Sequence, residues 1–304
     1  MLPPFEIHQP ATPAEAVALR VRHGESAALY AGGSELLLAM KEGLGAFEHL
    51  IDVKTIGGLD TLALAPDGAA LVIGAAVTHR ALERSPLLRA HFPMLADMER
   101  QVANARVRAV GTLGGNLCFA EPHSDPPTAL LVHEARVVLH GGAGPRRLAL
   151  ADFLVGPYES ALGPDEILTH VEVPLPPPRA AAAYLKFGLH ERPTVGVAAL
   201  LVPDVARGAV AEARVAVGCV GPVAARLPEV EHALRGVPLA TLEAGWPAAE
   251  TAGERLDAVG DLHGSAEYKR AMAGVFVKRA LAQAARRARG GVGGHIGAPH
   301  LADT

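Results

Sequence analysis

Cysteine is scarce in this chain. Its 304 residues include only Cys118 and Cys219, which lie far apart and outside any C-x-x-C pair. A disulfide framework, a cysteine-rich zinc site and an iron–sulfur cluster all need thiols that are more numerous and closely grouped. We therefore expect both cysteines to be small buried side chains, and any iron–sulfur centre to belong to another chain.

Excess positive charge and long apolar runs are also missing. The formal net charge is −4 at pH 7, so no broad basic surface is available to neutralise phosphates. No run of apolar residues is long enough to span a bilayer, and the N-terminal residues lack the features of a signal peptide. The basic stretch at residues 278–290 fits the cationic end of a helix. These features predict a cytoplasmic protein without an integral membrane segment or a nucleic-acid partner.

Familiar catalytic and nucleotide-binding motifs are absent as well. The chain has no G-x-G-x-x-G and no G-x-x-x-x-G-K-[ST], which excludes a Rossmann fingerprint and a P-loop. No Ser-His-Asp or Cys-His arrangement can be assigned from residue order. Glu121, His123 and Asp125 alternate in a proline-rich turn without a second group of ligands, so we expect no metal site and no catalytic residue in this chain.

What the sequence does contain is a pattern of mixed strands and helices, over a length that suggests two or three compact units. Residues 1–56 read as a small β-α-β unit, whose helix at 12–24 is capped by Thr12 and stopped by Gly24. Residues 57–177 read as antiparallel strands, with a P-D-G turn and a helical stretch at 80–104.

Three consecutive prolines at 176–178 cannot lie inside a regular element and mark a domain edge. Residues 178–287 then read as an α+β domain with three strands followed by helices at 228–236, 239–256 and 266–288. The glycine-rich tail at 288–304 carries no pattern, and we expect it to be disordered.

Two glycine motifs interrupt this pattern, "AGGS" at 31–34 and "GTLGGN" at 111–116. Glycine permits positive φ and close approach, so each motif can present consecutive backbone N–H groups to an anion. Ser34, Thr112 and Asn116 add side-chain donors. Either pair of glycines taken alone is more simply interpreted as an ordinary turn, but two loops together could hold one pyrophosphate between them.

Four segments, at 31–43, 50–53, 73–86 and 111–127, resemble the FAD-binding subunits of molybdenum hydroxylases, the family that includes carbon monoxide and xanthine dehydrogenases. Segments of the C-terminal half extend the resemblance to residues 3–287. The resemblance implies an α+β fold with two domains. Residues 1–177 would form a FAD-binding domain of the PCMH (vanillyl-alcohol-oxidase-like) type, with two subdomains divided near residue 56. Residues 178–287 would form a C-terminal domain like that of the CO dehydrogenase flavoprotein.

The resemblance also implies which residues bind FAD. Carried over position by position, they are Ala31, Gly32, Gly33, Ser34, Glu35, Leu36, Thr112, Leu113, Gly114, Gly115, Asn116, Asp125, Tyr184 and Lys186. The two glycine motifs would hold the pyrophosphate, Asp125 would lie near the flavin and ribityl chain, and Tyr184 and Lys186 would approach the isoalloxazine. Glu35 departs from the family pattern and is an awkward neighbour for a pyrophosphate, so we expect it to point toward the ribose or another donor.

The function implied is electron transfer by a noncovalently bound FAD. The molybdenum cofactor and two [2Fe-2S] clusters would lie in a large and a small partner subunit, in a dimer of heterotrimers, and FAD would pass electrons to an external acceptor. Two alternatives stay open. One is a stand-alone FAD-dependent oxidase or dehydrogenase with the same fold, and the other is an assembly subunit that binds no flavin.

Overall fold

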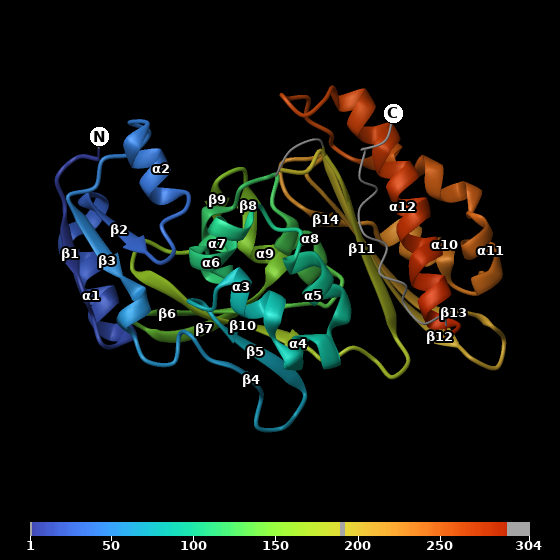
Figure 1. The fold of residues 1–304 in the computed structure, drawn as a ribbon, viewed down its shortest axis with the longest axis horizontal. Helices are drawn as coiled ribbons and strands as arrows, with labels where there is room; N and C mark the ends of the chain where they lie inside the picture. Colours follow the sequence, from blue (N-terminus) through green and yellow to red (C-terminus); the bar gives the residue numbers. More distant parts are fainter. Residues whose placement is uncertain (1, 189–191, 291–304) are drawn as a thin grey trace.

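The computed structural model describes residues 2–188 and 192–290. Figure 1 shows three neighbouring units in chain order: a small sheet with two helices, a central sheet with a group of short helices, and a sheet backed by the long helix α12. Within the described ranges no helix is both long and apolar enough to cross a membrane. Most of the tail for which disorder was expected, residues 291–304, falls outside the described residues.

The first unit is a three-stranded parallel sheet in the order β1-β3-β2. Its elements are β1 (Glu6–His8), α1 (Pro13–His23), the 3₁₀ helix η1 (Gly24–Ser26), β2 (Ala27–Tyr30), α2 (Leu36–Lys41), β3 (His49–Asp52) and the 3₁₀ helix η2 (Val53–Thr55). Thr12 Oγ1 accepts a hydrogen bond from the Glu15 N–H at 3.2 Å and caps α1, which ends at Gly24. The predicted start and stop of this helix are therefore confirmed.

The central unit has a five-stranded antiparallel sheet in the order β4-β5-β10-β6-β7. Its strands are β4 (Leu62–Leu64), β5 (Ala70–Gly74), β6 (Arg136–Gly141), β7 (Gly144–Ala149) and β10 (Glu166–Pro174), and β8 (Leu154–Gly156) pairs separately with β9 (Glu159–Ser160). Its helices are α3 (His79–Arg84), α4 (Pro86–His91), α5 (Pro93–Glu99), α6 (Ala105–Val110), α7 (Leu113–Phe119), α8 (Asp125–Leu131) and α9 (Leu150–Phe153).

Two segments of this unit differ from the sequence prediction. The glycines of the second motif lie in the first turn of α7 instead of in an open turn, because Thr112 caps that helix. The proline-rich segment after His123 also becomes helical, since Pro126 and Pro127 occupy the first turn of α8, where a missing N–H costs nothing.

The third unit is an antiparallel sheet in the order β11-β12-β13-β14, and it follows the predicted proline edge. Its elements are β11 (Ala181–Phe187), β12 (Val195–Asp204), β13 (Ala209–Gly218), β14 (Ala225–Arg226), α10 (Pro228–Leu234), α11 (Leu239–Ala244), the 3₁₀ helix η3 (Pro247–Arg255) and α12 (Ala266–Ala288). The prediction of a single helix at 239–256 is wrong, because two separate helices, α11 and η3, occupy this segment. Gly245, at φ +96°, ends α11, and Pro247 begins η3.

The third sheet is covered on both faces. Helix α12 packs on one face, while α5 and α8 of the central unit contact strands β11 to β13. Tyr184, Ala198, Leu200 and Ala216 therefore belong to the same buried cluster as the central sheet. This shared apolar interface holds the C-terminal sheet against the central unit.

Candidate functional site

The first glycine motif forms a loop at the carboxyl end of β2. Gly33, at φ +70°, reverses the chain there before α2 begins. Among the hydrogen bonds of the described residues, none uses the backbone N–H of any residue from 32 to 35. The Ser34 Oγ is shielded from solvent and has no hydrogen-bond partner. A buried hydroxyl beside several unpaired N–H groups is a donor set suited to a phosphate.

The second motif is different, because its backbone donors are already used. The N–H groups of residues 113–116 donate to Val77 O, Ala75 O, Thr112 Oγ1 and Thr112 O, at 3.0, 3.0, 3.1 and 2.9 Å in that order. The expectation that both motifs offer free backbone N–H groups is therefore wrong for this one. Capping of α7 and bonds to the segment after β5 consume them.

The two motifs nevertheless lie against each other. A Cβ on Gly32 would lie 2.1 Å from Val110 O, so only glycine allows the first loop to approach the chain just before the second motif. A Cβ on Gly115 would lie 4.0 Å from Ala31 Cβ and 2.9 Å from Oγ1 of Thr112, which caps the helix. Gly115 therefore faces the first loop, and a side chain there would enter the space between the motifs.

Leu113 and Gly114 have a packing role in this arrangement. Leu113 is buried in the main hydrophobic cluster, and a Cβ on Gly114 would lie 2.6 Å from Ala75 Cβ. Leu36 begins α2 immediately after the first loop. Of the residues expected in the second motif, Gly115 thus faces the space between the motifs, and Thr112 caps the helix that carries it.

Glu35 and Glu121 are held together by Arg192, a residue that the sequence analysis missed. The Arg192 guanidinium donates to Glu121 and reaches Glu35 Oε1 at 3.2 Å, while the Tyr158 hydroxyl donates to Glu121 Oε2 at 2.8 Å. Burial would lower the pKa of Arg192, but the two carboxylates outweigh it and raise that pKa. Glu35 thus has the separate donor that was expected, and no sequence pattern links residue 192 to residues 35 and 121.

Asp125 is the centre of a second polar group, which joins α8 to β11. Its Oδ1 accepts from the Tyr184 hydroxyl at 2.5 Å and its Oδ2 from Lys186 Nζ at 3.1 Å, and Lys186 also donates to Gln101 O at 2.5 Å. Burial raises the pKa of Asp125, partly offset by Lys186 and Tyr184. Burial is the main cause that raises the pKa of Tyr184 well above its usual range, and the neighbouring Asp125 carboxylate adds to this effect. The predicted trio is thus brought together as a hydrogen-bonded unit, in which Asp125 and Tyr184 are buried and Lys186 is partly exposed.

Asn116 connects this group to the second motif. Its Oδ1 accepts from the Ser124 hydroxyl at 2.7 Å, and Ser124 directly precedes Asp125. By contrast, Glu121, His123 and Asp125 do not converge, since His123 Nε2 contacts Asp261 Oδ2 at 2.7 Å while the two acids have the partners given above. Asn116 is therefore connected through Ser124 and its neighbour Asp125 to Tyr184 and Lys186.

Comparison with known families and proteins covers nearly the whole chain. Residues 3–176 match the family described as "FAD binding domain in molybdopterin dehydrogenase", and residues 190–284 match the "CO dehydrogenase flavoprotein C-terminal domain". The carbon monoxide dehydrogenase medium chain of Hydrogenophaga pseudoflava is 36% identical over 92% of this chain and 97% of its own length. The nicotine 6-hydroxylase medium subunit of Paenarthrobacter nicotinovorans is 31% identical over 94% and 99%.

Solved structures agree with this assignment. Carbon monoxide dehydrogenase from Hydrogenophaga pseudoflava, in a form lacking the Mo-pyranopterin moiety, superposes with a TM-score of 0.88 at 35% identity, covering 95% of this chain and 99% of that one. Quinoline 2-oxidoreductase from Pseudomonas putida 86 gives 0.87 at 27% identity, with the same coverage. The predicted fold class and family are confirmed, and the chain belongs to the FAD-binding medium subunits of the molybdenum hydroxylases, which are oxidoreductases.

Proposed function

We propose that this chain binds FAD noncovalently and carries electrons from partner [2Fe-2S] clusters to an external acceptor. The observation that carries the proposal is the loop at 32–35, which contains both unpaired backbone N–H groups and the unpartnered Ser34 hydroxyl. A pyrophosphate would satisfy all of these donors at once. The chain's domain family supports the same cofactor.

FAD supplies the redox chemistry when bound, and this chain's residues hold and orient it. The loop at 32–35 takes the pyrophosphate, and Gly115 keeps the opposite wall free of side chains. Arg192 keeps the Glu35 carboxylate engaged, which reduces its repulsion of the phosphates. Asp125, Tyr184 and Lys186 form the flavin-proximal part of the site, within a FAD-binding domain at 1–177 and a C-terminal domain at 178–287.

The partners follow from what this chain holds and from its relatives. Two cysteines cannot ligate a [2Fe-2S] cluster, which takes four protein ligands. The relatives from Hydrogenophaga pseudoflava and Paenarthrobacter nicotinovorans are a medium chain and a medium subunit. We propose a large subunit with the molybdenum cofactor and a small subunit with two [2Fe-2S] clusters, arranged as a dimer of heterotrimers.

Flavin retention tests the binding site. The purified chain should carry one FAD that acid releases, and Gly115→Val should lose it because the added side chain fills the space facing Ala31. Gly142→Val is the matched control, since a Cβ at that glycine meets nothing within 4 Å. Retention of FAD by Gly115→Val at the control's level would refute the proposed site, and absence of FAD from the wild type would favour the flavin-free assembly subunit.

Reconstitution tests the role in the complex. Under anaerobic conditions the FAD-loaded chain alone should not be bleached by carbon monoxide, xanthine, nicotine or aldehydes, because it has no assigned acid–base residue for a substrate. Adding the two partner subunits should permit bleaching by the substrate of the complex. Rapid bleaching of the lone chain would favour the stand-alone oxidase instead.

A further inference from the structure

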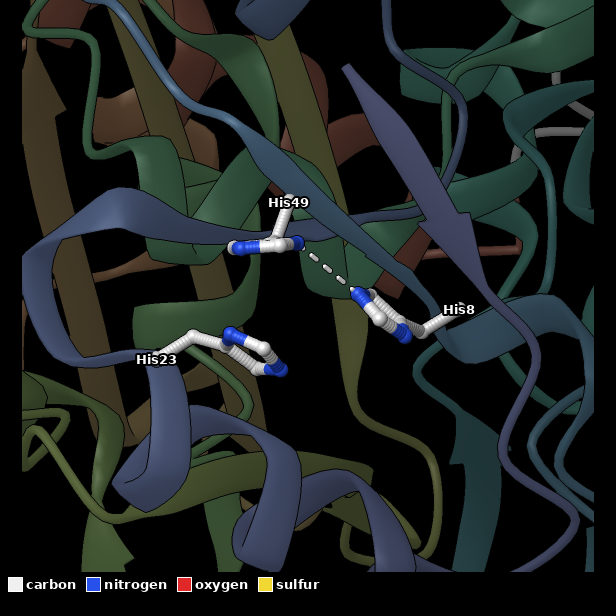
Figure 2. A group of neighbouring side chains, drawn as sticks. All are labelled: His8, His23 and His49. Carbon is white, nitrogen blue, oxygen red and sulfur yellow. Dashed lines mark hydrogen bonds between the residues drawn. The ribbon is translucent and has the colours of Figure 1, made fainter.

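Three histidines that are distant in the sequence converge in the first unit of the fold. His8 comes from β1, His23 from the last position of α1 and His49 from the first position of β3, and Figure 2 shows their rings directed toward one another. Their ring nitrogens include a set that lies within 4.8 Å of one another. This arrangement differs from the expectation that the chain contains no metal-ligand group.

The fold accounts for the convergence. Glu6 pairs in parallel register with His49, and His8 pairs with Ile51, so the three polar side chains point to one face of the sheet. Helix α1 buries Ala16 and Val17 with Ile51 in the same cluster, on that face. Gly24 ends the helix just where His23 reaches the other two rings.

We propose that His8, His23 and His49 bind a divalent transition-metal ion, with Zn²⁺ as the expected occupant and the Glu6 carboxylate as a fourth ligand. Three imidazoles with one carboxylate are a donor set that zinc accepts in tetrahedral geometry. Bonds of about 2.0–2.1 Å place tetrahedral ligand atoms about 3.4 Å apart. The His8 Nε2 to His49 Nδ1 distance is 3.0 Å, and Glu6 Oε2 lies 3.6 Å from His49 Nδ1 and 3.9 Å from His8 Nε2.

Hydrogen bonds do not account for the convergence of all three histidine rings. One bond joins His8 to His49, and the described residues offer the His23 ring no hydrogen-bond partner. The His23 ring nevertheless lies 3.8 Å from the His49 ring, centroid to centroid. The His8 and His49 side chains are only 16% and 21% exposed, so an ion there would be partly shielded from water. A shared metal ion would replace the hydrogen bond between His8 and His49 and would also engage the His23 ring, which has no hydrogen-bond partner among the described residues.

The site is separate from the proposed flavin loop. His49 pairs with Ala27 at the start of β2, whereas the loop at 32–35 follows Tyr30, which pairs with Asp52 at the other end of the strands. The metal would therefore fasten the end of α1 to the sheet, without touching FAD. Flavin content can serve as an independent measure of correct folding.

The test uses the full chain without a histidine tag, stripped with a chelator and titrated with Zn²⁺ by calorimetry at a pH where imidazoles are neutral. We expect one Zn²⁺ per chain, a rise in Tm of about 2–5 °C, and a zinc X-ray absorption spectrum with imidazole scattering. His23→Gln and His49→Gln should each weaken binding at least about tenfold while retaining FAD.

Two controls locate the ion. His232→Gln changes a histidine of α10, and the double variant His295→Gln/His300→Gln changes two residues outside the described part of the chain. Both should bind Zn²⁺ like the wild type. The proposal is overturned if the wild type binds no Zn²⁺, if His23→Gln and His49→Gln bind it normally, or if either control abolishes the single site.

Discussion

Ser34→Ala should have opposite effects on the ligand-free and the FAD-bound protein. Ser34 Oγ is shielded from solvent and unpaired, and it lies beside Gly111, since a Cβ added to Gly111 would be 3.3 Å from it. We expect rotation about χ1 to turn this hydroxyl toward an anion when one binds at the loop. Ser34→Ala therefore removes an unpaired buried hydroxyl from the protein without FAD, and a hydrogen bond to phosphate from the protein with FAD.

The magnitudes follow from the hydroxyl alone. A buried hydroxyl without a partner costs about 1–3 kcal/mol, so removing it should raise the free energy of unfolding of the ligand-free chain by about 1 kcal/mol. In a protein of this size that is a rise in Tm of about 2 °C. A hydrogen bond to a charged phosphate contributes about 1.5–3 kcal/mol, so FAD affinity should fall about 10- to 150-fold.

The assay is a pair of measurements on one protein preparation: thermal unfolding without flavin, and FAD titration by quenching of flavin fluorescence. Thr128→Val is the matched control, because Thr128 in α8 is fully buried and its Oγ1 is also without a partner. That variant should gain stability in the same way and keep wild-type affinity for FAD. If Ser34→Ala instead loses stability without FAD, or binds FAD as tightly as the control, the phosphate role of this hydroxyl is refuted.

Arg192→Gln should weaken FAD binding about two- to fivefold by releasing Glu35, and Glu35→Gln in the same chain should restore part of the loss; strictly additive effects in FAD titrations would contradict this pairing. Tyr184→Phe removes the hydroxyl that donates to Asp125, so we expect the free energy of unfolding to fall by about 1–2 kcal/mol. The absorption of the flavin or its reoxidation rate should also change. An unchanged spectrum and rate would place Tyr184 outside the flavin site. Burial alone would raise the pKa of Asp261, but hydrogen bonds to its carboxylate lower it to about 2. The ionised Asp261 therefore stabilises the fold fully above about pH 4, and this effect is lost as the pH falls toward 2. Asp261→Asn should lower Tm at neutral pH but much less near pH 2. An equal drop in Tm at both pH values would contradict this reasoning.

Much of the local structure was predictable from short-range patterns. Thr12, Pro13 and Gly24 delimit α1 through interactions within a few residues of each helix end, so the sequence was sufficient there. The P-D-G turn between β4 and β5 and the proline edge before β11 were predictable for the same reason. Thr112 could also have been predicted as a helix cap from its local sequence, but the glycines after it favoured an open turn. The prediction that this motif has free backbone N–H groups was therefore wrong.

The two glycine motifs could be located from the amino-acid sequence alone, and a family resemblance predicted which residues would bind FAD. Which motif has unpaired backbone N–H groups depends on tertiary contacts, because the partners of the N–H groups at 113–114 come from the chain after β5. The same is true of the contact from Arg192 to Glu35 and of the convergence of His8, His23 and His49. Each of these depends on distances between residues remote in sequence, which strand register and helix packing set and no local pattern encodes.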